Sequence, residues 1–325
     1  MNDLKLFRVV DGRSIEVAGS AVALERHLQT LIEANMEAML GIRFLASEYA
    51  TGPRHRGRID SLGLDENGNP VIIEYKRSNG KAVITQALSY LAWLRDHRHE
   101  FESLVKERLG HEVASSVDWS SPRLVCVAGD YTVHDVNAVE EIGRRIDLVS
   151  YRDFGGGLLA LQLVASMGGS STPPRSQANA MSAPPVLPTG GGSTVKSVRQ
   201  IFESAPDSLR GLYADLDAML VGNGDVQKEF QLHYIAYRKI KNVATVRFQP
   251  RSHTLVVRLT VDPDTVELRE GFARDVRGIG CLGTGDLEVR IRSQEDLARA
   301  GDLVRRSIGG NRSQELGVFG SSLRR

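Results

Sequence analysis

Three charged residues lie inside two short apolar runs of this 325-residue sequence, where strand residues facing a core are expected. The first run holds Asp60, and the second holds Glu74 with Lys76 two positions later. The polar segment 65–69, Asp-Glu-Asn-Gly-Asn, separates the runs and predicts a β-hairpin. If the pairing is centred on Asn67, Asp60 and Glu74 are cross-strand neighbours, and the strand period of two places Lys76 on the face of Glu74. We therefore expect two carboxylates and an ammonium group to converge.

Such a cluster is costly in a half-buried sheet unless a cation or a reacting phosphate uses it. Hard oxygen ligands such as Asp60 and Glu74, with the backbone carbonyl of Ile73 or Tyr75, suit Mg²⁺ or Mn²⁺. A bound cation would orient a water molecule, lower its pKa and neutralise phosphate charge. Lys76 could position that water or stabilise the transition state. The residue types therefore predict hydrolysis of a phosphodiester bond.

The alternative interpretation of the acidic pair is an ion-pair ladder on an exposed hairpin face. The flanking residues argue against it, because they indicate a sheet that is buried on both faces: Ile59, Leu62, Ile72 and Ile73.

A helix is expected after the hairpin, and its Gln86 and Tyr90 share one face because they are four residues apart. Asp60, the Glu-X-Lys element at 74–76 and this Gln-X-X-X-Tyr element together resemble the PD-(D/E)XK nuclease superfamily, in particular its RecB-like branch. The segment 25–90 is also similar to the nuclease domain of NucS-type mismatch endonucleases. The resemblance covers about the first half of the chain.

The resemblance implies a Mg²⁺-dependent (or Mn²⁺-dependent) DNA endonuclease with Asp60 and Glu74 as metal ligands. It adds further catalytic positions: Lys76, Gln86, Tyr90 and Glu25. Gln86 and Tyr90 would hold Lys76 or touch the nucleic-acid backbone. Glu25 best matches the family's helix glutamate, although Glu33 and Glu37 lie on the same helix face.

Other interpretations stay open at this point. RNA as the substrate is not excluded, and a homodimer is one way to cut both strands. A protein that keeps the nuclease fold without turnover, and binds nucleic acid or another partner, is the alternative function. Basic residues near the hairpin are candidate phosphate contacts or a solvated basic loop: Arg54, Arg56, Arg58, Arg77 and Lys81.

The elements that must position these residues form an α/β domain at 1–165, with a mixed central sheet flanked by helices in the order αβββαβαββ. A hairpin at 6–10 and 14–17 precedes it. We expect helices at 22–40, 81–109 and 135–145, and strands at 42–49, 123–128, 146–151 and 158–163 around the Asp60/Glu74 hairpin.

A Pro/Gly/Ser-rich segment at 166–196 predicts a flexible linker. Beyond it, 197–325 predicts a smaller α+β domain with helices at 197–203, 208–221 and 294–307 and strands at 234–239, 243–249, 254–259 and 287–291. This part resembles an uncharacterised module fused to such nucleases. It carries no catalytic constellation, so we expect it to bind substrate or a partner.

Composition sets few limits. Hydrophobic residues make up 41% and charged residues 25%, and no apolar run is long enough for a membrane span. Residues 1–165 hold 19 Lys and Arg against 23 Asp and Glu, so the remainder holds 22 against 17. The two cysteines, Cys126 and Cys281, are far apart, which argues against a disulfide framework. We expect a cytoplasmic protein that has no membrane partner, since no secretory signal opens the sequence.

Overall fold

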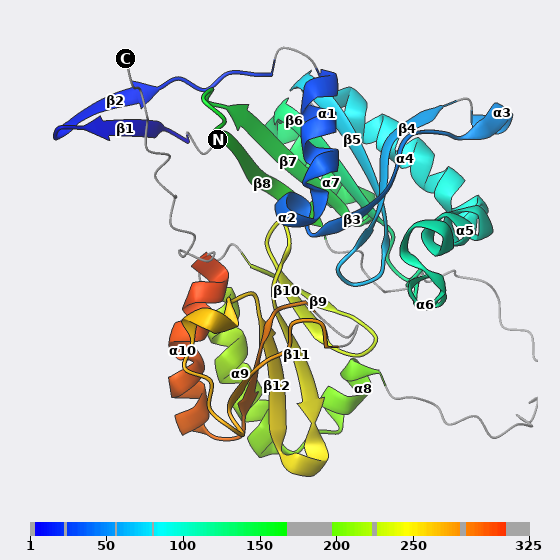
Figure 1. Cartoon of the computed structure of the whole chain (residues 1–325). Helices are drawn as coiled ribbons and strands as arrows, with labels where there is room; N and C mark the ends of the chain where they lie inside the picture. Colours follow the sequence, from blue (N-terminus) through cyan, green and yellow to red (C-terminus); the bar gives the residue numbers. More distant parts are fainter. Residues whose placement is uncertain are drawn as a thin grey trace, which may run out of the picture. The chain divides into compact units, whose positions relative to one another are not determined.

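The computed structural model describes residues 4–22, 25–55, 57–79, 81–167, 197–222, 226–279 and 284–309, without the side chains of 54, 55, 78, 79, 81 and 82. The chain divides into two compact units, Met1–Gly191 and Gly192–Arg325 (Figure 1). Most of the predicted linker, 168–196, lies outside the described residues. No helix in the described ranges is long and apolar enough to cross a membrane.

The first unit is built on a six-stranded mixed sheet in the order β3-β4-β5-β6-β7-β8 (Figure 1). The pairs β5–β6 and β6–β7 are parallel, and the other neighbours are antiparallel. The predicted mixed sheet with flanking helices is therefore confirmed. Its strands are β3 (Ile42–Ala50), β4 (Arg58–Asp65), β5 (Pro70–Asn79), β6 (Arg123–Asp130), β7 (Ile146–Asp153) and β8 (Leu159–Met167).

Helices cover both faces of this sheet, and the N-terminal hairpin forms a separate two-stranded sheet. One core joins β4, β5 and β6 to the apolar side of α4, with Ile72, Leu124 and Trp93 buried in it. The elements are β1 (Leu6–Val10), β2 (Arg13–Val17), α1 (Glu25–Ala34), α2 (Met36–Leu40), α3 (Gly52–His55), α4 (Lys81–Asp96), α5 (Arg98–Leu109), α6 (His111–Ser115) and α7 (Val133–Ile142).

Two helices predicted as continuous are each broken, so those predictions are wrong. The first ends near Asn35, whose amide bonds to the Ile32 carbonyl and whose side chain bonds to the Leu31 carbonyl. The second breaks at His97, whose ring stacks on Trp93 at 5.0 Å and whose Nδ1 lies 2.8 Å from the Trp93 carbonyl oxygen. In both places a side chain adds a bond to a helix carbonyl, which apolar spacing does not reveal.

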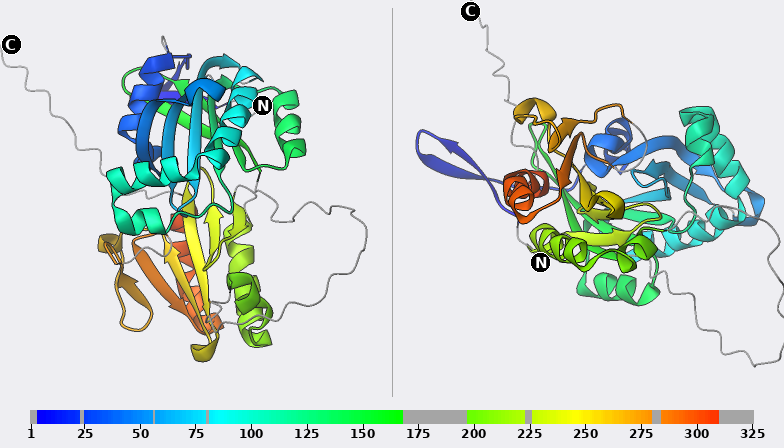
Figure 2. Two further views of the ribbon diagram at one scale, coloured as in Figure 1. Left: turned by 90° about the vertical axis from the view of Figure 1, so that its right-hand side faces the viewer. Right: turned by 90° about the horizontal axis from the view of Figure 1, so that it is seen from below.

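The second unit is a six-stranded antiparallel sheet in the order β13-β14-β12-β11-β10-β9, and its apolar face packs on helices (Figures 1 and 2). The predicted α+β class is confirmed, but β9 and β13 were not foreseen. The elements are α8 (Val198–Glu203), α9 (Asp207–Val221), β9 (Gln227–Phe230), β10 (Ile235–Arg238), β11 (Asn242–Gln249), β12 (Thr254–Leu259), β13 (Ala273–Asp275), β14 (Leu287–Ile291) and α10 (Gln294–Gly309), with 3₁₀ turns at Pro250–Ser252 and Pro263–Thr265.

Candidate active site

Strands β4 and β5 separate at the position of Asp60 and Glu74. Their paired register runs from Leu64↔Pro70 to Ser61↔Ile73, so the next opposed residues are Asp60 and Glu74, as the sequence predicted. Beyond this point β4 stays paired with β3, and β5 continues beside β6. The two strands therefore form a fork, and the acidic pair lies where it opens.

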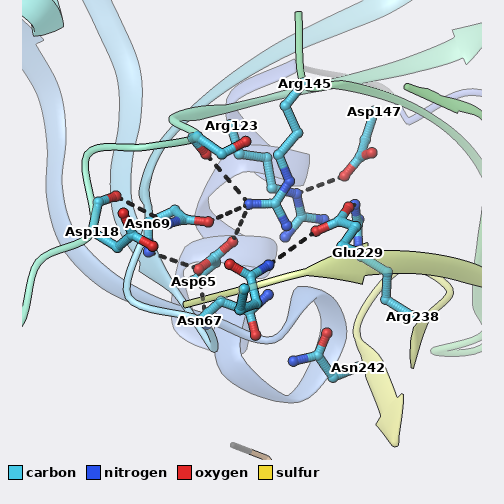
Figure 3. Close-up of polar contacts among 12 residues, drawn as sticks. Asp65, Asn67, Asn69, Asp118, Arg123, Arg145, Asp147, Glu229, Arg238 and Asn242 are labelled. Atoms are coloured by element: carbon cyan, nitrogen blue, oxygen red, sulfur yellow. Dashed lines mark hydrogen bonds and ion pairs between the residues drawn. The ribbon is translucent and has the colours of Figure 1, made fainter. Parts of the chain in front are cut away.

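The turn that sets this register is held by a buried ion pair (Figure 3). Arg145 donates to Asp65 at 2.9 Å and to the side-chain oxygen of Asn69 at 2.6 Å. Asp65 also accepts the amides of Asn67 and Asn69, each at 2.9 Å. Gly68 completes the turn with a φ of 82°, a left-handed conformation that favours glycine. Because both Arg145 and the amides of the turn hold Asp65, the register of β4 and β5 cannot easily shift and separate the two carboxylates.

At the fork, carboxylate side chains accept the amide hydrogen bonds that backbone carbonyls of the neighbouring strand accept in the paired part of the hairpin. The Asp60 amide donates to Glu74 Oε1 at 3.1 Å, and the Tyr75 amide donates to Asp60 Oδ2 at 2.9 Å. Glu74 is completely buried, whereas Asp60 is partly exposed. Among the described residues, the buried Oε2 of Glu74 has no hydrogen-bond partner. A buried carboxylate oxygen without a partner is expensive, so this atom points to a missing ligand.

The electrostatics lead to the same conclusion. Burial, followed by the nearby charge of Asp60, raises the pKa of Glu74 to about 9. Burial also raises the pKa of Asp60, against the lowering effects of the Tyr75 amide and the Lys76 charge. Two carboxylates this close cannot both ionise cheaply. A bound cation would remove that penalty.

Lys76 projects from the same strand and is held by the first helix. Its Nζ lies 3.1 Å from Glu25 Oε1, and the Arg77 amide donates to Glu25 Oε2 at 3.0 Å. Burial lowers the pKa of Lys76, but the bond to Glu25 and the charges of Asp60 and Glu74 outweigh it, so the pKa is raised. Lys76 is therefore an ammonium group at neutral pH, and it suits charge stabilisation rather than proton abstraction.

The three candidate glutamates of the first helix have different surroundings. Only Glu25 contacts Lys76 in the described bonds. Glu33 accepts from the Ser61 hydroxyl at 2.6 Å and from Gln29 at 3.0 Å, and Glu37 is exposed. The geometry therefore favours Glu25 as the helix residue of this site.

Gln86 and Tyr90 meet each other and the start of β4. Gln86 Nε2 donates to Tyr90 Oη at 3.2 Å, and the same oxygen accepts the Arg58 amide at 3.1 Å. The ring of Tyr90 packs so closely on Gly57 that a Cβ there would lie 2.4 Å from Cε1. Of the two roles expected for this pair, holding Lys76 is not seen in the described bonds, which run to the β4 backbone instead. The pair therefore positions the strand that carries Asp60.

The predicted phosphate contacts are only partly described. Arg58 is exposed and forms an ion pair with Glu48, and Arg77 is exposed at the end of β5. Arg77 also lines a cavity of about 710 Å³ at the carboxyl ends of β5, β6 and β7, together with Arg152. The side chains of Arg54 and Lys81, and the whole of Arg56, lie outside the described residues.

Two polar residues that the motif spacing does not indicate lie beside Asp60. Gln29 donates to the Asp60 carbonyl at 2.9 Å, and Glu48 lies between the register pairs that flank Asp60. Glu48 has a φ of 52°, and its charge contributes to the raised pKa of Asp60. A left-handed glutamate costs of order 1 kcal/mol or more. An acidic residue inside a predicted strand, one position after Ser47, is the signal that could have indicated Glu48.

Within the described ranges, no group of three or more His, Cys, Asp or Glu side chains could hold a metal ion. Two carboxylates are sufficient for Mg²⁺, which keeps several water ligands and uses substrate phosphates. Asp60 and Glu74 therefore fit a cation of this type.

Comparison with known proteins gives a family model for the C-terminal part of the chain and one relative that spans most of it. Residues 198–308 match the family model described as "Domain of unknown function (DUF5655)". An "Uncharacterized protein" of Haemophilus influenzae is 24% identical over 313 residues, which cover 94% of this chain and 99% of that protein.

Similar solved structures match part of this chain only. A repair endonuclease from Pyrococcus abyssi is 20% identical, covering 42% of this chain and 51% of that chain, with a TM-score of 0.25. A structure described as an EndoMS-dsDNA2 complex is 23% identical, covering 44% and 49%, with a TM-score of 0.23. The chain thus spans about half the length of these solved proteins, and TM-scores this low carry no argument about function.

Proposed function

We propose that this protein is a metal-dependent nuclease that hydrolyses phosphodiester bonds in DNA, with the fork between β4 and β5 as its active site. One observation carries the proposal: Glu74 is fully buried beside Asp60, with an oxygen that no described residue satisfies. Residues 1–165 would form the nuclease domain, and 197–325 would form an accessory domain that helps select substrate.

Asp60 and Glu74 would hold Mg²⁺ or Mn²⁺ through the carboxylate oxygens that face the fork. Such an ion, when bound, supplies an activated water and neutralises charge on the scissile phosphate. The Asp60 and Tyr75 amides keep the two carboxylates in place. A rigid acceptor pair of this kind needs little rearrangement to bind a cation.

Lys76 would donate to the attacking water or to a non-bridging phosphate oxygen. Its ammonium group stays charged because Glu25 and the acidic pair favour that form. Glu25 also accepts the Arg77 amide, so it orients Lys76 relative to the strand. Gln86 and Tyr90 would act through the β4 backbone at Arg58, two residues before Asp60.

DNA is preferred over RNA because of the motif resemblance of the first half of the chain, from Glu25 to Tyr90. The test is a cleavage panel of single-stranded, duplex, branched and mismatched DNA and of RNA, each in Mg²⁺ and in Mn²⁺. Wild type, Glu74→Gln and the exposed control Glu37→Gln are compared. We expect metal-dependent cleavage by wild type and by the control. Glu74→Gln should cleave more slowly than wild type by about 100-fold or more.

Two outcomes would contradict the proposal. If Glu74→Gln cleaves as fast as wild type, the fork is not the active site. If the wild type binds DNA but cleaves no substrate with either metal, the protein is an inactive nuclease-fold binding protein instead. Cleavage of RNA alone would change the substrate and leave the site intact.

A further inference from the structure

The second unit carries four arginines around one buried glutamate. Arg274 Nε lies 2.8 Å and Arg290 Nε lies 3.3 Å from Glu288 Oε1. Arg247 and Arg258 approach Glu288 Oε2 at 3.8 and 3.9 Å. We refer to Arg247, Arg258, Arg274 and Arg290 as the arginine cluster.

Strand register brings the cluster together on the sheet face opposite the helix-packed core, where Arg258 is buried and the other three arginines are at least partly exposed. Two adjacent rows run across neighbouring strands: Arg274, Glu288 and Arg258 in one, and Arg290, Val256 and Arg247 in the next. Residues of the alternate set, such as Val257 and Val289, lie in the apolar core under the helices. The cluster is thus a product of tertiary structure, because its members come from four strands.

Three guanidinium groups of the cluster reach solvent and share one carboxylate, whereas Arg258 is buried and also donates to the Ile279 carbonyl at 3.3 Å. The side chains of Arg274, Arg290 and Arg247 are 51%, 36% and 27% exposed and share Glu288, which is 1% exposed. Burial, followed by the charge of Arg258, lowers the pKa of Arg247. Guanidinium groups crowded in this way repel one another, and an anion bound over them would relieve the repulsion.

We infer that the arginine cluster is a second phosphate-binding site, which holds the phosphodiester backbone of DNA outside the active site. Arginine pairs with phosphate through two parallel hydrogen bonds. Four neighbouring strands span about 14 Å, which suits several successive phosphates of one strand better than one small anion. The choice of DNA among phosphate ligands rests on the proposed function, while the cluster itself does not.

The test measures DNA binding by the full chain in EDTA, with short fluorescent single-stranded and duplex DNA over a series of salt concentrations. Arg247→Gln/Arg290→Gln removes two exposed charges and leaves Arg258 and Arg274 to pair with Glu288. We expect a loss of affinity of about tenfold or more near 0.15 M salt, and a salt slope reduced by about 2.

The matched control is Arg299→Gln/Arg305→Gln, which removes two exposed charges from α10, the helix on the other face of the sheet. We expect this control to bind DNA within about twofold of wild type, since neither arginine would touch a phosphate. Arg247→Lys/Arg290→Lys, which keeps the charge, should retain most of the binding. If the glutamine double variant fails to fold, the single variant Arg290→Gln is compared with Arg299→Gln, and only the former should weaken DNA binding.

Equal losses in the cluster variant and the α10 control would overturn the inference, because only overall charge would then matter. Binding unchanged by the glutamine substitutions in the cluster would overturn it as well. So would a cluster that binds a nucleoside triphosphate and not DNA. If the wild type cleaves while cluster variants bind normally, the inference fails and the proposed function stands. If binding depends on the cluster but no substrate is cleaved, the proposed function fails and the inference stands.

Discussion

Replacing Glu74 by glutamine should stabilise the metal-free protein. The buried carboxyl has its pKa raised from 4.5 to about 9, so at pH 7 it costs about 3 kcal/mol relative to the unfolded chain. Glutamine keeps the oxygen that accepts the Asp60 amide and removes this cost, but its NH₂ group lacks a partner, at about 1 kcal/mol. The expected net gain in the free energy of unfolding is about 2 kcal/mol.

The pH dependence of this difference follows from the direction of the shift. The folded-state pKa lies above the unfolded value, so the contribution of the carboxyl is fully present below pH 4.5 and is lost as the pH rises toward about 9. The advantage of Glu74→Gln should therefore be near zero at pH 5 and grow by about 1.4 kcal/mol per pH unit up to about pH 9.

The assay is urea unfolding in EDTA followed by tryptophan fluorescence. Both tryptophans of the sequence, Trp93 and Trp119, lie in the first unit, so the signal reports on the domain that carries Glu74. Mn²⁺ should raise the urea midpoint of the wild type and leave that of Glu74→Gln almost unchanged. A variant less stable than wild type at pH 7, or a difference that does not change with pH, would refute the reasoning.

Three further predictions concern the surroundings of the fork. Lys76→Met should slow cleavage about 100-fold, measured in single turnovers, and change the unfolding free energy by less than about 1 kcal/mol, because its ion pair is partly exposed. Arg145→Ala should cost about 3–5 kcal/mol in urea unfolding, because it leaves Asp65 charged and buried; an unchanged midpoint would show that the pair does not hold the turn. Tyr90→Phe should cost about 1 kcal/mol and reduce cleavage, since the Arg58 amide loses its acceptor; full activity would leave the tyrosine with a packing role alone.

The active-site hairpin could be predicted because its information is local. Asn67 marks the centre of a short turn, and a hairpin with a known centre has only one register, which places Asp60 opposite Glu74. The buried flanks, such as Ile59 and Ile72, were also visible as apolar residues in the sequence. Short-range pattern and strand period were therefore enough to bring the two carboxylates together.

Features that depend on side-chain bonds to the backbone, or on contacts between residues far apart in the sequence, could not be predicted. The breaks at Asn35 and His97 coincide with side-chain bonds to helix carbonyls inside an otherwise regular apolar pattern. The positive φ of Glu48 follows from how β3 pairs with β4, which no local pattern reports. The arginine cluster needs four strands in a known order, so the sequence shows only scattered arginines.

One rate measurement tests most directly whether the fork is a metal-dependent nuclease centre. Cleavage of a DNA substrate in Mn²⁺ is followed in single turnovers for wild type, Glu74→Gln and Glu37→Gln, at concentrations where each protein saturates the DNA. We predict that Glu37→Gln matches the wild type and that Glu74→Gln is slower by about 100-fold or more. Equal rates for all three proteins would contradict the assignment of the fork as a metal-dependent nuclease centre.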